Sequence, residues 1–151
     1  MYAKPAKAVS LLFTCIGLAC SVSAQSLNVT LSGLQSDQGK LVVRVYNSDK
    51  QWLSDKPNEI YKLHTINLKD QVKDEKLEFS LDLPDGDYAL SVFQDKDEDG
   101  ALKSNWIGIP REPVAISNNA KGSMGAPEFK DAKFQIAGQP VLQTLNLANF
   151  N

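Results

Sequence analysis

The sequence lacks cysteine wherever a folded domain is expected. It has 151 residues and 2 cysteines, Cys15 and Cys20, and both lie in the apolar N-terminal stretch. Without them, the rest of the chain can form no disulfide, thiolate nucleophile or cysteine-ligated metal site. Histidine is almost as scarce, because His64 is the single residue of this type. A zinc site is therefore disfavoured, since zinc prefers cysteine and histidine ligands. His64 without a neighbouring catalytic motif is interpreted as an ordinary strand residue.

Long hydrophobic runs and an excess of basic charge are also absent. Crossing a bilayer takes about 20 apolar residues, and the longest apolar run, Ala8 to Ala19, is too short. The chain is therefore not predicted to span a membrane. Lys and Arg number 16 against 18 Asp and Glu, with no basic patch interleaved with aromatic residues. Nucleic-acid binding is excluded on this ground.

The N-terminus has the three parts of a secretory signal peptide. Lys4 and Lys7 precede the apolar run, and Val22-Ser23-Ala24 ends in the small residues that a signal peptidase cleaves after. We expect residues 1–24 to be removed and residues 25–151 to form one periplasmic or secreted domain. The mature net charge is then about −4, since two lysines leave with the signal.

A second interpretation of the same stretch stays open. Leu18-Ala19-Cys20 is also similar to a lipoprotein cleavage site, with Cys20 as the acylated residue. The mature domain would then be anchored to a membrane through its lipid.

The mature chain alternates apolar and polar residues with a period of two, which is typical of half-buried strands. No segment keeps a helical period. About seven short strands in one domain predict an all-β, antiparallel β-sandwich. We expect two hairpins, the first from strands 27–32 and 41–46 and the second from strands 77–83 and 87–94. The other predicted strands are 59–68, 114–116, 132–136 and 140–147.

Two tryptophans lie outside the predicted strands. Trp52 belongs to the loop from Asn47 to Asn58, and Trp106 belongs to a long irregular segment from Leu102 to Phe129. Because large aromatic side chains usually serve burial, we expect Trp52 to cover an edge of the sandwich. For Trp106 we expect the same role as a hydrophobic plug, with stacking on a sugar as the alternative.

One acidic stretch carries the most specific chemistry. Asp95, Asp97 and Asp99 alternate directly after a predicted strand, and Gly100 follows. These are the first positions of a calcium-binding loop, in which alternating carboxylates curl around one hard cation. The pattern then departs from an EF-hand, because Trp106 stands where the closing glutamate belongs. The stretch is therefore interpreted as a partial ligand arc on another scaffold.

Calcium needs six to eight oxygen ligands, so the arc has to be completed from elsewhere. The predicted metal ligands are Asp95, Asp97, Asp99, the carbonyl of Ala101, Asn105 and Glu112, with water filling the shell. Lacking a bidentate glutamate, the site is expected to bind calcium weakly, on the order of 10⁻⁴–10⁻³ M. The alternative is a solvated acidic turn whose charge is offset by Lys96 and Lys103.

Several short motifs, in order, resemble the bacterial family of exported proteins catalogued as domain of unknown function 2141. The motifs are Asp85-Gly86-Asp87-Tyr88-Ala89, Phe93 to Gly100, Gly108-Ile109-Pro110-Arg111-Glu112, Ser117-Asn118-Asn119-Ala120 and Gly125 to Ala132. The resemblance implies an exported immunoglobulin-like or transthyretin-like β-sandwich and no particular activity. It also suggests that the acidic loop, Arg111 with Glu112, and Ser117 to Asn119 meet in one composite site. The alternative is that these residues pin a long loop for stability only.

Three functions remain at this stage. The favoured one is a non-enzymatic envelope module with a calcium-stabilised loop that binds a protein or glycan partner. A carbohydrate-active enzyme that uses the carboxylates around Asp95 to Asp99 is the alternative, and a purely structural envelope component is the third. Carboxylate pairs in the chain could support glycosidase chemistry, but the sequence does not single out one pair.

Overall fold

The structure is a computed structural model that describes residues 24–150. The predicted signal peptide and Cys20 lie outside the described residues, except for Ala24, which begins strand β1. Among residues 24–150, no helix is long and apolar enough to cross a membrane. The described elements are β1 (Ala24–Ser32), β2 (Lys40–Tyr46), η1 (Asp49–Gln51), η2 (Pro57–Glu59), β3 (Lys62–Asn67), β4 (Lys76–Pro84), β5 (Gly86–Asp95), β6 (Val114–Ile116), η3 (Ser117–Asn119), α1 (Phe129–Ala132), β7 (Phe134–Ile136) and β8 (Val141–Asn146).

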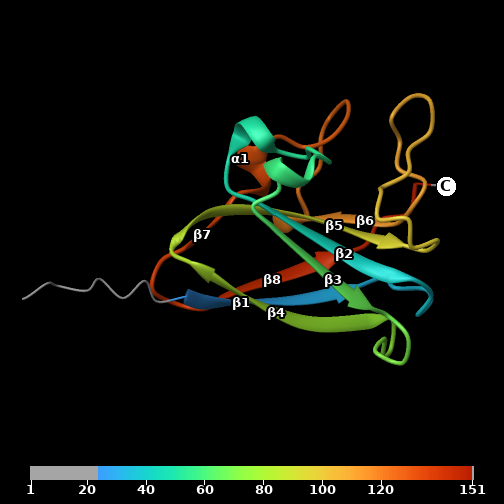
Figure 1. The fold of residues 1–151 in the computed structure, drawn as a ribbon, viewed down its shortest axis with the longest axis horizontal. Helices are drawn as coiled ribbons and strands as arrows, with labels where there is room; N and C mark the ends of the chain where they lie inside the picture. The colour runs from blue at the N-terminus through green and yellow to red at the C-terminus, as the bar shows by residue number, and fades with distance from the viewer. Residues whose placement is uncertain (1–23, 151) are drawn as a thin grey trace, which may run out of the picture.

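The strands form two layered sheets, which confirms the predicted all-β sandwich (Figure 1). One sheet has the order β4-β1-β8 and the other β3-β2-β5-β6, with β7 also paired to β5. All pairs are antiparallel except β1 and β8, which run parallel with Leu27 opposite Val141. This pair is the one departure among the described strands from the predicted antiparallel arrangement. The chain enters β8 from the other sheet, so no hairpin imposes an antiparallel direction on it.

The core lies between the two sheets. Alternate residues of each strand point inward, and each large apolar side chain buried there contributes roughly 1.5–3 kcal/mol. The most deeply buried members are Leu27, Leu31, Leu41, Val43, Val45, Leu68, Leu83, Leu90, Val92 and Leu145.

Neither predicted hairpin forms. β1 pairs with β4 and β8, whereas β2 pairs with β3 and β5. The segment between β1 and β2 carries Leu34, which is buried in the core, so this segment crosses between the sheets instead of turning at a solvent-exposed tip. Between β4 and β5, neither Asp85 nor Gly86 has the positive φ that a two-residue hairpin turn requires. The chain therefore passes from one sheet to the other there as well.

β5 is buried on both faces, because loops cover its outer side. Tyr46, Ala89, Phe129 and Ala132 form a second apolar cluster outside the sandwich. Trp52 packs edge-on against Tyr46 and Phe129, with ring centroids 5.3 and 5.8 Å away, and its indole N–H donates to the Pro127 carbonyl at 2.8 Å. The prediction that Trp52 serves burial is confirmed, but it covers the outer face of β2 and β5 and not an edge of the sandwich. The covered outer face of β5 leads directly to the acidic loop.

Candidate metal site

The acidic loop leaves the end of β5, so its first carboxylate is held by a rigid strand. Asp95, Asp97 and Asp99 each place one carboxylate oxygen within 4.8 Å of the others. Glu98 and Gly100 have positive φ values of 60° and 79°, and these two left-handed residues curl the loop so that alternate side chains converge. The structure thus brings together three of the six residues predicted as ligands.

Asp95 differs from its two neighbours because it is buried, with 1% of its surface exposed. Its Oδ2 accepts a hydrogen bond from the Gly100 N–H at 2.8 Å. Its Oδ1 is inaccessible to solvent and has no hydrogen-bond partner among the described residues. An unsatisfied buried acceptor costs about 1–3 kcal/mol, more for a charged one. A cation that reached this oxygen would remove that cost, and three convergent carboxylates are donors that a hard metal ion prefers.

Lys103 supplies positive charge to the same carboxylates. Its ammonium contacts Asp97 Oδ2 and lies 3.1 Å from Asp99 Oδ2. Hydrogen bonds to these carboxylates raise the pKa of Lys103 above its ordinary value. The Ala101 N–H, which donates to Asp99 Oδ1 at 3.0 Å, and the Lys103 ammonium lower the pKa of Asp99. Asp99 is thus held as a carboxylate, whereas a general acid for glycoside hydrolysis needs a raised pKa.

Glu112 holds the two ends of the acidic loop instead of joining the three aspartates. It is buried, and its Oε1 accepts the Lys96 N–H at 3.1 Å while its Oε2 accepts the Lys103 N–H at 3.3 Å. A carboxylate that satisfies two backbone donors in this way fixes the width of the loop.

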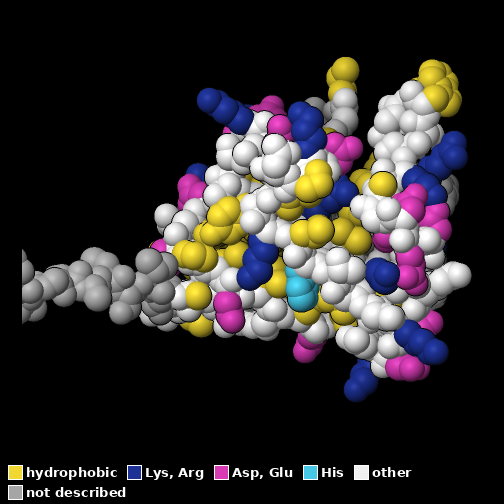
Figure 2. All heavy atoms as spheres, viewed as in Figure 1, with side chains coloured by type: hydrophobic (Ala, Val, Ile, Leu, Met, Phe, Trp, Pro, Cys, Tyr) yellow, Lys and Arg dark blue, Asp and Glu magenta, His cyan; other side chains and the backbone are white. Residues whose placement is uncertain are grey.

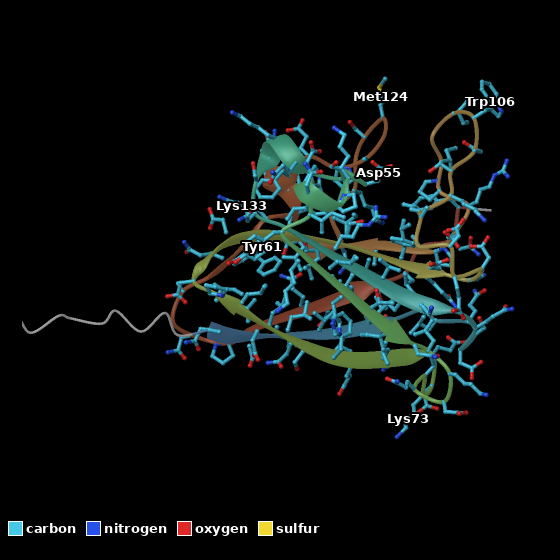
Figure 3. All side chains as sticks on the ribbon, viewed as in Figure 1. Asp55, Tyr61, Lys73, Trp106, Met124 and Lys133 are labelled. Carbon is cyan, nitrogen blue, oxygen red and sulfur yellow. The ribbon has the colours of Figure 1, made fainter. Side chains whose placement is uncertain are left out.

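Asn105 forms the turn of a projecting hairpin, which we call the finger (residues 103–111). Its Oδ1 accepts the N–H groups of Ile107 and Ile109 at 3.1 and 2.9 Å, and its carbonyl accepts the Gly108 N–H at 3.0 Å. This closed turn places Trp106 at the tip (Figure 3), where 94% of its surface is exposed. The expectation that Trp106 is a hydrophobic plug is wrong, because the turn directs the side chain away from the sandwich.

Ser117 to Asn119 lie elsewhere, so the expected composite site is wrong in this part. Ser117 Oγ accepts the Leu90 N–H at 2.8 Å and donates to the Ala132 carbonyl at 2.6 Å. Asn118 bonds to Gln143, and Asn119 bonds to the backbone of β8. These side chains fasten β5, α1 and β8 to one another.

Arg44 is the important residue that sequence reasoning missed. It is only 8% exposed, its guanidinium lies 5.0 Å from the Phe93 ring centroid, and its Nη2 donates to the Gly100 carbonyl at 3.3 Å. Gly100 therefore links two buried charged residues, because its N–H donates to Asp95 and its carbonyl accepts from Arg44. The alternation of β2 places Arg44 on the outer face, which the sequence alone suggests is in solvent, and no sequence signal shows that loops cover it.

Comparison with known proteins leads to one family. No curated protein and no solved structure matches the chain. Residues 29–143 match the family model described as "Uncharacterized protein conserved in bacteria", domain of unknown function 2141. The matched range contains the acidic loop, the finger and Arg44, and it covers most of the sequence. The chain therefore belongs to this bacterial family, as its motifs predicted.

Proposed function

We propose that this protein is an exported, non-enzymatic β-sandwich module whose acidic loop binds calcium weakly. The observation that supports this most strongly is the convergence of Asp95, Asp97 and Asp99, together with the buried Oδ1 of Asp95 that has no hydrogen-bond partner among the described residues. A calcium ion accepts such oxygens at flexible distances, whereas magnesium demands near-octahedral geometry that this open arc does not offer.

The ligands in this proposal are the three aspartates and the Ala101 carbonyl, with water completing the shell. Glu112 and Asn105 support the loop and the finger, because their oxygens already accept backbone N–H groups. Calcium has to displace the Lys103 ammonium from Asp97 and Asp99. This competition, together with the missing bidentate glutamate, argues for a dissociation constant on the order of 10⁻⁴–10⁻³ M.

Calcium titration followed by thermal melting tests the metal site. At a calcium concentration ten times the dissociation constant, linkage predicts about 1.4 kcal/mol of added stability, which corresponds to a rise of a few degrees in Tm. Asp97→Asn should abolish most of this rise, whereas Asp74→Asn, in the β3–β4 loop, should keep it. No calcium-dependent rise in the wild type, or an equal rise in Asp97→Asn, would remove the basis for the proposal.

The finger supports a binding function over a purely structural one. Trp106 and Ile107 are exposed by 94% and 57%, and exposed aromatic side chains with apolar neighbours are enriched at recognition surfaces. We infer that the finger contacts a glycan or an envelope protein, with the Trp106 ring as the contact surface.

A glycan array with the mature protein tests this inference on the glycan side. Trp106→Ala should lose the captured glycans and leave Tm unchanged, because this side chain has no packing partner to lose. Trp106→Phe, which keeps a ring, should retain part of the binding. Glycan binding that persists unchanged in Trp106→Ala would rule out the finger as the contact.

A further inference from the structure

Arg44 carries a buried charge without an ionic partner. Its residue surface is 8% exposed, and among residues 24–150 no carboxylate oxygen lies within 4.0 Å of its guanidinium. The Gly100 carbonyl, the Phe93 ring and the Tyr46 hydroxyl face it, and its Nε has no hydrogen-bond partner among the described residues. Buried arginines are normally paired with an anion, and the described carboxylates form no such ion pair with Arg44.

A cavity of about 140 Å³ opens beside Arg44. Its apolar walls are Pro57, Ile60 and Leu63, and Asp55 and Gly100 complete the lining. Figure 2 shows the hollow on this face, between the segment of residues 47–61 and the finger, with basic and apolar side chains around it. Asp55 is exposed and has no ion pair among the described residues (Figure 3).

The residues that line the cavity indicate which functional groups a ligand should carry. A planar guanidinium matches the two oxygens of a carboxylate, and the apolar walls suit a short aliphatic chain. Asp55 would repel a phosphate dianion but attract an ammonium group. The volume is below the roughly 300–1,000 Å³ of pockets for drug-sized ligands, so only a small molecule or the end of a larger one fits.

We propose that this cavity binds the carboxylate of an aliphatic amino acid, either free or as the C-terminal residue of a peptide. The carboxylate meets Arg44, the aliphatic side chain lies against Ile60 and Leu63, and a free ammonium group faces Asp55. The proposal does not depend on calcium binding, although Gly100 touches both sites.

Isothermal titration of the mature protein, with a chelator present to remove calcium, tests the carboxylate. Leucine and isovalerate should bind with millimolar affinity, and leucinamide, which lacks the carboxylate, should bind at least tenfold more weakly. Tighter binding of leucine than of Gly-Leu identifies the free amino acid as the ligand, and the reverse order identifies a peptide terminus. The proposal is overturned if no acid binds at 10 mM or if leucinamide binds as well as leucine.

Two variants locate the binding. Arg44→Gln should abolish it, but this buried change also threatens folding. Leu63→Glu avoids that difficulty, because Leu63 is 58% exposed while its side chain lines the cavity. It should weaken leucine binding at least tenfold with an unchanged Tm. Leu142→Glu, on the other sheet and 66% exposed, is the matched control and should bind normally. Equal affinities in both glutamate variants would place the ligand elsewhere and overturn the proposal.

Discussion

Lys103 gives the acidic loop its own cation. Asp97 and Asp99 would repel each other strongly at this separation, and the ammonium between them relieves the repulsion without a metal. Lys96 lies in the same loop, yet its side chain takes part in none of the ion pairs of the described chain. Both lysines thus add one positive charge near the acidic loop, but only Lys103 contacts the carboxylates directly.

Replacing Lys103 and Lys96 in turn separates two effects on calcium affinity, the direct contact of a lysine with the carboxylates and its positive charge. Lys103→Asn removes the competing ammonium and offers an amide oxygen, so we expect calcium affinity to rise on the order of tenfold. Lys96→Asn removes the same charge and should change affinity by less than about threefold, because exposed charges at longer range are screened. Calorimetric titration of both variants measures the difference. Equal gains would show that net charge alone governs the site.

At the scale of elements, the end of β5 is held in place by the segment that leads into β2. Gly39 precedes β2 with a φ of +78°, and a Cβ there would lie 2.1 Å from the Asp95 carbonyl oxygen. Gly138, in the β7–β8 turn, has a similar φ of +66° but open space around the same position. The close approach at Gly39 therefore fixes where the acidic loop begins.

Alanine at these two glycines separates steric overlap from backbone strain. Gly138→Ala should cost about 1–2 kcal/mol, since only the left-handed backbone is penalised. Gly39→Ala adds overlap with backbone atoms, and we expect a total of about 3–5 kcal/mol. Urea denaturation gives both values. A Gly39→Ala cost no larger than that of Gly138→Ala would contradict the close packing at the root of the acidic loop.

At the scale of the whole molecule, β8 closes the smaller sheet. It covers β1 along Leu27 to Ser32 in parallel register, and Leu145 is fully buried in the core. Ala148 then bridges to the larger sheet through hydrogen bonds with Val114 at 2.8 and 3.0 Å. The C-terminal strand thus connects both layers.

Truncation tests this closing role. A chain that ends at Gln139 loses β8 and exposes an unpaired edge of β1 together with apolar core, so we expect aggregation or no cooperative melting. A chain that ends at Ala148 keeps β8 and the bridge, and its Tm should stay within a few degrees of wild type. Cooperative melting of the shorter chain at the wild-type Tm would show that β8 is dispensable.

How far the candidate site could be predicted varies from residue to residue. The spacing of Asp95, Asp97 and Asp99 was sufficient to expect their convergence, because a local turn decides it. The contacts of Asn105 and Glu112 with backbone N–H groups were not predictable, since they depend on how the finger closes. Arg44 was missed because its burial comes from loops that are distant in sequence.

The sequence by itself determined the strands, the sandwich class and the family, because alternation with a period of two and short motifs are local properties of the chain. Only the tertiary structure decided which strands pair, since pairing depends on crossovers such as Asp85–Gly86 and on a C-terminal strand that returns beside the first. It also decided that Asp95 and Arg44 are buried while Trp106 is exposed. The burial of these three side chains depends on loops and turns that are packed or exposed by the whole molecule, and the local alternation of the strands does not specify it.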